Sequence, residues 1–69
     1  MDMINFVGKY IYVKLSSDRV YSGRVLEVSN TGKDEEGVDI WIISIEDKFG
    51  NLVSFSKKEI KYLEQQRVK

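Results

Sequence analysis

The strongest structural signal in this chain lies between residues 8 and 25, which read Gly8-Lys9-Tyr10-Ile11-Tyr12-Val13-Lys14-Leu15-Ser16-Ser17-Asp18-Arg19-Val20-Tyr21-Ser22-Gly23-Arg24-Val25. Ile11, Val13 and Leu15 alternate with tyrosine or lysine, and this period of two is typical of a β-strand with one buried face. The serines and the aspartate that follow can bond to nearby backbone amides, which favours a tight turn. The segment therefore predicts a β-hairpin.

The second strand of this hairpin is expected to run from about residue 19 to residue 29. Tyr21, Gly23 and Val25 form its expected inward set, whereas Leu26 and Val28 indicate a change of phase. A phase slip beside a strand glycine is typical of a bulge or a sharp bend. One bent strand can in this way contribute to both halves of a barrel.

The pattern predicts two further strands and two connections after the hairpin. Residues 30–37 are expected to form a polar, glycine-bounded loop. Residues 38–45 are apolar on both alternating sets, which suits a central strand covered on both faces. A hairpin turn over 47–51, with Gly50 at positive φ, is expected to lead into a short strand over 52–55.

Residues 57–64 permit two interpretations. Ser56 and Glu59 have the spacing of a capping box. Ile60 and Leu63 lie three positions apart, as on one face of a helix. A terminal strand would instead close a barrel and remove an exposed edge. We expect the strand, followed by a frayed tail over residues 65–69.

Together these elements predict an all-β fold, a small, five-stranded, strongly bent SH3-like barrel with an optional short N-terminal helical turn. The expected domain spans residues 1–69, because no linker, repeat or low-complexity tract divides the chain. A chain of this size buries only about 60% of the surface that its unfolded form exposes, so its stability margin is thin. The chain has no cysteine and no histidine, which removes disulfides and the common zinc sites. Self-association is the remaining support, so a homo-oligomer is expected.

The charge balance limits the classes of partner. The chain has 11 basic and 11 acidic residues and thus a formal net charge of zero, which argues against tight non-specific binding of duplex DNA. No apolar run approaches the ~20 residues that span a bilayer, and the first residues lack the form of a signal peptide. A cytoplasmic protein without a membrane partner is expected.

Catalysis is not expected. A nucleophile needs a base beside it, and only carboxylates and lysines could serve here. The acidic pairs Glu35-Glu36 and Glu46-Asp47 lie in or beside expected loops, where carboxylates are usually solvated charges. Residues 34–39 lack the alternating ligand spacing of a calcium loop, so neither a metal nor another cofactor is expected.

The first hairpin resembles the first motif of the Sm-like (LSm) family of small RNA-binding β-barrel proteins. That motif has a Gly-Lys pair, alternating valines, a leucine, an Asp-Gly-Arg turn, an aromatic residue and a strand glycine. The matching positions here are Gly8, Lys9, Ile11, Val13, Leu15, Asp18, Arg19, Tyr21 and Gly23. The chain departs from the motif at the turn, where Ser17-Asp18-Arg19 lacks the glycine. The resemblance extends over nearly the whole chain, although only this motif is specific.

The resemblance implies an RNA site built from two loops. In the family, uridine is bound by an Asp and an Asn before the third strand and by an Arg-Gly pair between the last two strands. This chain offers Asn30 at the first place and Lys57 and Lys58 at the second, so these three residues are the candidate RNA contacts. Lysine lacks the planar stacking fork of arginine, so the site is non-standard and uridine specificity is not carried over.

The resemblance also implies ring assembly, because subunits of the family pair the fourth strand of one with the fifth strand of the next. The corresponding candidate interface residues are Leu52, Val53, Phe55, Ile60, Tyr62 and Leu63. The expected function is therefore a non-enzymatic protein that self-associates into a ring and binds single-stranded RNA. The alternative is an SH3-like or Tudor-like module without RNA binding, which would hold a protein partner in a groove of aromatic residues. Candidates for that groove are Tyr10, Tyr12, Trp41 and Phe49.

Overall fold

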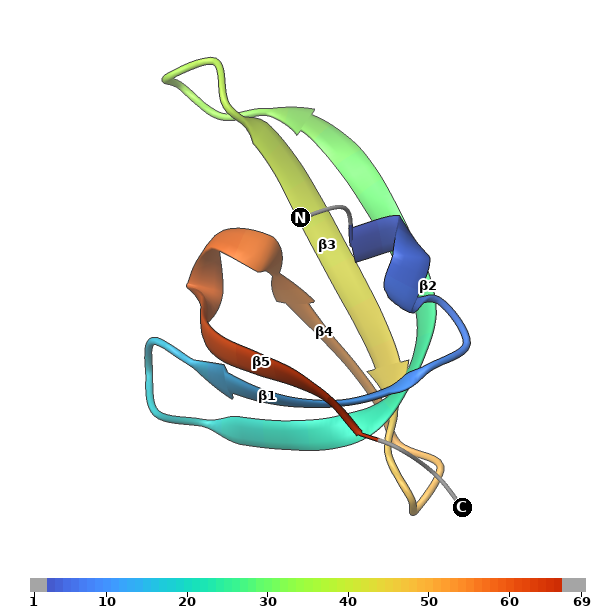
Figure 1. Cartoon of the computed structure of the whole chain (residues 1–69). Helices are drawn as coiled ribbons and strands as arrows, with labels where there is room; N and C mark the ends of the chain where they lie inside the picture. The colour runs from blue at the N-terminus through green and yellow to red at the C-terminus, as the bar shows by residue number, and fades with distance from the viewer. Residues whose placement is uncertain (1–2, 67–69) are drawn as a thin grey trace.

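The computed structural model describes residues 3–66 and contains one antiparallel sheet of five strands (Figure 1). The elements in chain order are η1 (Met3–Phe6), β1 (Tyr10–Leu15), β2 (Val20–Lys33), β3 (Asp39–Glu46), β4 (Leu52–Ser56), η2 (Lys57–Glu59) and β5 (Ile60–Gln66). Across the sheet the strands follow the order β4-β3-β2-β1-β5. The all-β, five-stranded expectation is confirmed, and η1 is the N-terminal helical turn.

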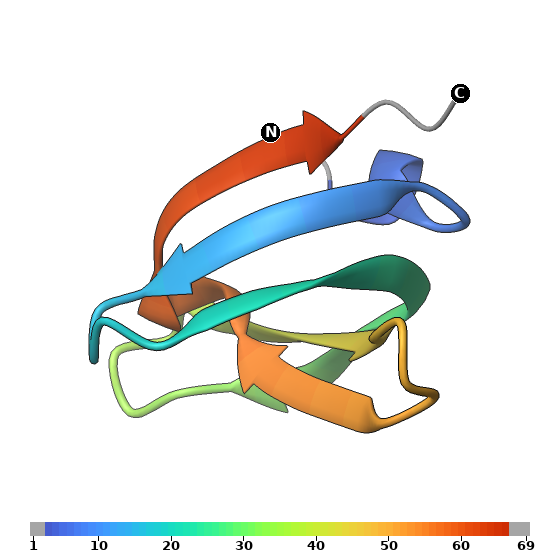
Figure 2. The same ribbon diagram turned by 90° about the horizontal axis from the view of Figure 1, so that it is seen from below.

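The sheet is strongly curved but is not closed into a barrel within the described residues. β5 pairs with β1, and β4 pairs with β3, but β4 and β5 are not paired with each other. Figure 2 shows β1 and β5 in one layer and β3 and β4 in the other, with β2 passing between them. The expectation that the last strand removes an exposed edge is therefore wrong, because the fold leaves one edge at β4 and one at β5.

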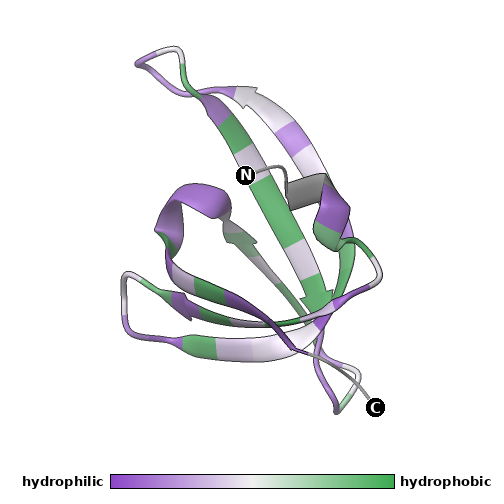
Figure 3. Ribbon diagram, in the orientation of Figure 1, coloured by the Kyte–Doolittle hydropathy of each residue, from purple (hydrophilic) through white to green (hydrophobic). Residues whose placement is uncertain are grey.

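The core lies between the two layers and follows the predicted alternation. Its buried residues are Ile11, Val13, Leu15, Val25, Ile43, Ile45 and Phe55. Figure 3 shows the corresponding apolar bands along β3 and β1. The expected cover on both faces of β3 is complete on one face only, since Ile43 and Ile45 are buried whereas Ile40 and Ile42 are half-buried.

The predicted bend of β2 is present. The first half of β2 pairs with β1, the second half pairs with β3 from Arg24 onward, and the register shifts between Val25 and Glu27. This bulge leaves Leu26 exposed. Gly23 precedes the shift, and a Cβ built on it would overlap the carbonyl oxygen of Glu46. Glycine at this position therefore lets the end of β3 approach β2 closely.

The boundaries of β2 and β5 differ from the sequence expectation. Residues 30–33 were expected in a loop but belong to β2, because Asn30 lies opposite Trp41 and Lys33 lies opposite Asp39 in the ladder. The ladder is irregular between these two pairs, where the Gly32 N–H bonds to the Asn30 side chain instead of to β3. At the other end, β5 forms as expected, and the helical signal before it corresponds to the single turn η2, where the Ser56 N–H donates to the Glu59 carboxylate at 3.1 Å.

The expectation of a frayed tail over residues 65–69 places the end of the last strand two residues too early. Gln65 and Gln66 continue β5, and Gln66 lies opposite Tyr10 of β1. The side-chain oxygen of Gln66 also accepts a hydrogen bond of 2.7 Å from the Ser22 hydroxyl. Residues 67–69 lie outside the described part of the chain.

Each of the first three strand connections is a five-residue turn with the same backbone bonding. The first residue donates its N–H to the carbonyl of the fifth and accepts from the N–H of the fourth. The fourth residue has positive φ in each case, which confirms the expectation for Gly50. The three turns are Leu15–Arg19 with Asp18 (φ 69°), Asp34–Val38 with Gly37 (φ 80°) and Asp47–Asn51 with Gly50 (φ 81°). Aspartate tolerates this left-handed conformation better than most residues, so Asp18 can stand where the other two turns have glycine.

Within residues 3–66, no helix has the length and apolar character needed to cross a membrane.

Replacement of Gly23 by alanine should destabilise the fold by about 1–3 kcal/mol, the usual cost of overpacking. The added Cβ must displace the backbone of Glu46, which cannot move away as a flexible side chain would. Urea unfolding measures the change. Ser22→Ala is the matched control, since Ser22 already carries a Cβ and the variant loses only the exposed hydroxyl bond to Gln66. Equal stabilities of Gly23→Ala and Ser22→Ala would contradict the close approach.

Candidate nucleic-acid interface

Two segments that are far apart in the sequence meet at one end of the sheet. The turn between β2 and β3 delivers the start of β3, and η2 follows the end of β4 beside it, in contact with β3. Between them lies a groove of about 380 Å³. Its lining residues are Val38, Asp39, Trp41, Ser56, Lys57 and Lys58. The structure thus places the two lysines predicted as RNA contacts in one groove, and it adds Trp41 to them.

Asn30, the third predicted RNA contact, borders the groove without lining it. It lies opposite Trp41 in the ladder. Its side-chain oxygen accepts a hydrogen bond of 2.8 Å from the Gly32 N–H, and its amide is one of the groups that lower the pKa of Asp39. The bond to Gly32 holds the irregular end of β2, so Asn30 has a structural role next to the groove.

The acidic residue of the groove is compensated by a neighbouring lysine. Lys33 Nζ lies 3.0 Å from Asp39 Oδ1. The Lys33 ammonium, and then the Asn30 amide, lower the pKa of the Asp39 carboxyl below its ordinary value of 3.8. Asp39 is therefore ionised and paired with Lys33 at neutral pH. Lys58 in turn acts on the nearby Asp34 carboxylate and helps to lower the pKa of that group.

Trp41 supplies an aromatic surface in this groove. It is half-buried and is the single tryptophan of the chain. Aromatic rings bind the bases of single strands by stacking, while lysines contact the phosphates. The sequence did not indicate this role, because Trp41 is brought to residues 57 and 58 only by the hairpin register and the position of η2. The sequence could have placed Trp41 near the site only through its pairing with Asn30. That pairing follows only if residues 30–33 are recognised as part of a strand.

The four aromatic residues proposed for a peptide groove do not share one surface. Trp41 lines the groove beside η2, whereas Tyr10 and Phe49 line a second groove beside the β3–β4 turn. Tyr12 contacts Tyr62 edge-to-face, with ring centroids 6.2 Å apart. This pair of tyrosines lies on β1 and β5, apart from both grooves.

A hydrogen bond to a neighbouring side chain holds Tyr62 in this pair. Its hydroxyl donates to the Glu64 carboxylate at 3.0 Å. This hydrogen bond and the charge of Glu64 raise the pKa of the Tyr62 phenol above its ordinary value of 10.0.

Most of the predicted interface side chains belong to the core of the same chain. Phe55 is only 5% exposed, and three others pack against the core, namely Val53, Ile60 and Leu63. Leu52 and Tyr62 are 71% and 50% exposed and are available to a partner. A charged substitution at Phe55 would therefore report on folding rather than on assembly.

A strand added at β4 or β5 would bond to the outward backbone groups of these strands, not to the side chains named above. In an antiparallel ladder, alternate residues direct both backbone groups toward the same neighbour. The bond from the Asp47 N–H to the Asn51 carbonyl fixes the phase in β4, so Leu52 and Ser54 direct their N–H and C=O groups away from β3. The pairing with β1 likewise leaves Leu63 and Gln65 as the outward residues of β5.

The turn that positions the groove is held by an aspartate. Asp34 Oδ1 accepts hydrogen bonds from the backbone N–H groups of Glu36 and Val38, at 2.8 and 3.0 Å. Asp47 does the same in the β3–β4 turn for Phe49 and Asn51, both at 2.9 Å. Both turns have the spacing Asp-x-x-Gly, and this shared spacing is the sequence signal that places the first turn within the longer loop expected over residues 30–37.

The comparisons with known proteins supply no relative, since no family model, curated protein or solved structure matches the chain. Within residues 3–66, no group of three or more carboxylates lies close enough together to hold a metal ion.

Acid should weaken the two aspartate turns. Backbone N–H groups, those of Val38 and Asn51 above all, lower the pKa values of Asp34 and Asp47 below the ordinary 3.8. A lowered folded-state pKa gives stability that is complete above the unfolded pKa and is lost as the pH falls through the folded pKa. We expect the free energy of unfolding to fall less steeply from about pH 5 to pH 2 in a double Asp34→Asn, Asp47→Asn variant than in the wild type.

The amide oxygens of the double variant still accept the turn hydrogen bonds but do not titrate, which is the reason for the expected difference. Urea unfolding at three pH values measures it. Glu35→Gln, which removes an exposed charge of the same turn, serves as control. Parallel pH profiles of the wild type and the double variant would contradict the prediction.

Proposed function

We propose that this protein is a non-enzymatic Sm-like subunit that assembles into a homo-oligomeric ring through β4 and β5 and binds single-stranded RNA in the groove between Trp41 and η2. One observation carries the proposal. The two strands that the Sm-like resemblance assigns to subunit contacts are the two strands at the ends of the open sheet.

Edge pairing would satisfy both ends of the sheet at once. Unpaired N–H and C=O groups on β4 and β5 are a template for another strand. Because the two edges differ, pairing β4 of one copy with β5 of the next is a head-to-tail contact, which generates a ring when the rotation closes. Exposed Leu52 and Tyr62 would add apolar contact area on either side of such a joint.

The groove fits a single strand bound without strong sequence readout. Trp41 offers a stacking surface, and the lysines of η2 offer charges for phosphate. The lysines lie in the connection between the last two strands, which binds RNA in the resembling family, and Trp41 lies in β3 shortly after the loop that supplies the family's other contacts. With a net charge of zero, one subunit should bind weakly, and repetition of the groove around a ring would raise the overall affinity.

A protein-interaction module without RNA binding is the second candidate function. It is favoured by the separate aromatic groove at Tyr10 and Phe49, which has no place in the RNA proposal. The two candidates differ in what the groove at η2 does: the module predicts no salt-sensitive affinity for RNA.

Replacement of Ser54 by proline should break the assembly. Ser54 is exposed, and its N–H points outward from β4, so proline removes a donor needed by a second subunit without removing a bond to β3. Ser54→Ala is the matched control, because both variants lose the 2.9 Å contact with the Ser44 hydroxyl. Light scattering on a sizing column should give a multi-subunit mass for the wild type and Ser54→Ala, and a monomeric mass for Ser54→Pro. A Ser54→Pro variant that keeps the full mass rules out pairing at this edge.

Binding of a short RNA should quench the fluorescence of Trp41 in a salt-dependent manner. For two phosphate contacts to a single strand, the affinity should fall roughly sevenfold between about 50 and 200 mM salt. Lys58→Gln should weaken binding about threefold at the higher salt concentration and reduce the salt slope by about 0.7. Hexauridylate and hexaadenylate are suitable probes.

The control for this titration is Lys61→Gln. Lys61 is a lysine of the neighbouring β5 that pairs with Asp18 rather than lining the groove. Equal losses in Lys58→Gln and Lys61→Gln would indicate a diffuse charge effect, and absence of quenching by either RNA would leave the interaction module as the better function.

A further inference from the structure

The first half of β2 has a strand neighbour on one side only. Residues 20–23 pair with β1. On the opposite side, β3 pairs with β2 only from Arg24, which lies opposite Glu46, and then turns away. Within the described residues no strand pairs with this short segment from that side. The bend in β2 therefore creates a third free edge, distinct from those of β4 and β5.

The phase of the ladder determines which backbone groups lie on this edge. The Leu15 N–H bonds to the Arg19 carbonyl at 2.8 Å, and the Val25 N–H bonds to the Lys9 carbonyl at 2.9 Å. Odd-numbered residues of this half of β2 therefore bond to β1, and the even-numbered ones face away from it. Val20 and Ser22 thus direct their N–H and C=O groups outward, with the spacing that an added strand requires.

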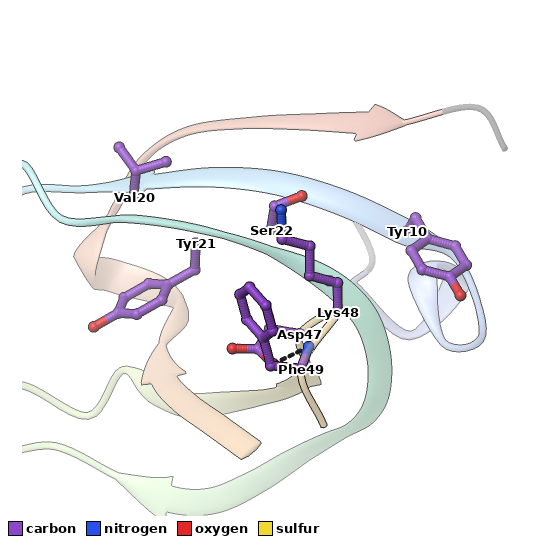
Figure 4. A pocket seen from close by; sticks show the side chains of 8 residues that line it. Tyr10, Val20, Tyr21, Ser22, Asp47, Lys48 and Phe49 are labelled. Carbon is purple, nitrogen blue, oxygen red and sulfur yellow. Dashed lines mark hydrogen bonds between the residues drawn. The ribbon is translucent and has the colours of Figure 1, made fainter. Parts of the chain in front are cut away.

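This edge forms one wall of the second groove, which has a volume of about 330 Å³ (Figure 4). The opposite wall is the β3–β4 turn, from Asp47 to Phe49. Phe49 is 78% exposed, and Figure 4 shows its ring beside β2, near Tyr21. The Tyr21 ring is fixed by stacking on the core residue Phe55, with centroids 6.1 Å apart. The groove therefore combines free ladder groups with two aromatic rings.

The groove contains one charged residue of each sign, Asp47 and Lys48, and only the second is available to a ligand. The Asp47 carboxylate accepts backbone hydrogen bonds from Phe49 and Asn51 and a further bond from the Asn51 amide at 3.3 Å. Both oxygens of this carboxylate are therefore engaged in hydrogen bonds within the β3–β4 turn. The Lys48 side chain is exposed, and its ammonium lies 5.2 Å from the centre of the Phe49 ring. The groove thus holds one carboxylate and one ammonium, and the ammonium lies next to the apolar Phe49 ring, where an acidic group of a ligand can reach it.

We propose that this groove binds an extended peptide segment of a protein partner by adding a short strand to β2 at Val20 and Ser22. One apolar side chain of the segment lies against Phe49 and Tyr21, and a neighbouring acidic side chain faces Lys48. Strand addition uses main-chain bonds for affinity and alternate side chains for selectivity. A nucleobase could stack on Phe49 as well, but it would leave the repeated N–H and C=O groups of β2 without matching partners, so a peptide is favoured. The proposal does not depend on RNA binding.

The test is a titration of the full-length chain, labelled with nitrogen-15, with an acetylated hexapeptide of alternating valine and glutamate. We expect amide shifts confined to Val20–Gly23 and Lys48–Gly50, with a dissociation constant on the order of 0.1–1 mM. Phe49→Ala should weaken binding at least about fivefold, through the lost apolar contact. Leu52→Ala is the matched control, because Leu52 is an equally exposed apolar residue close to the same turn but outside the groove.

Two further probes separate the modes of binding. The same peptide with an N-methyl group on every residue has no backbone N–H to donate, cannot pair as a strand on either edge and should produce no shifts. Lys48→Glu should transfer the preference to a peptide of alternating valine and lysine. Absence of shifts with the N-methylated peptide, together with a transferred preference in a folded Lys48→Glu variant, supports the proposal.

Four results would overturn it. These are the absence of shifts at the two segments, equal binding of the N-methylated peptide, and shifts at these amides with hexauridylate but not with the peptide. The fourth is a fall in the native mass of Phe49→Ala, which would mark the groove as a contact between copies of the chain.

Discussion

The close contact between Gly23 and the end of β3 governs the rest of the structure. It lets one long strand leave the layer of β1 and enter the layer of β3, and the bulge after Val25 restores the inward phase of the apolar residues. The core can then form between two layers of a single sheet. The same bend leaves the sheet with open ends and exposes a short edge of β2, so the places where a partner could bind follow from the way the strand turns.

The three free edges are suited to different partners. The edges at β4 and β5 are whole strands at opposite ends of the sheet, which suits joining identical subunits in series. The β2 edge presents only two outward residues, next to a protruding aromatic ring and a lysine. It suits a short peptide. The η2 groove has no free strand edge and offers Trp41 with lysines, which suits a nucleic-acid strand. A single small sheet could thus serve assembly, RNA binding and a protein partner at separate places.

Local patterning predicted the parts of the fold that local physics controls. The alternation around Val13, the positive φ of Gly50 and the phase slip of β2 are all present. Residues 30–33 were assigned to a loop because polar side chains resemble loop composition, whereas their strand conformation is set by pairing with β3. The closure of the barrel was overestimated for a related reason: whether β4 and β5 meet depends on sheet curvature, which no short pattern encodes.

The site was predictable in part. Lys57 and Lys58 were identified by analogy with the loops of a family, and they do line a groove. Asn30 was identified in the same way, yet it bonds to its own strand. Trp41 and the β2 edge required the three-dimensional register. For assembly, the resemblance pointed to β4 and β5, which are the end strands of the sheet. Phe55 of that expected interface is in the core, and the outward backbone groups of Ser54 and its neighbours form the edge of β4.

Residue-resolved amide hydrogen exchange of the full-length chain tests the central claim, that the edges of β4 and β5 pair between subunits. In solution, the outward N–H groups of Ser54, Leu63 and Gln65 should exchange slowly, as they do inside a sheet. The N–H groups of Val20 and Ser22, on the edge left for a ligand, should exchange rapidly in the same sample. Rapid exchange at all of these positions, in a protein whose inner strands are protected, would contradict the account.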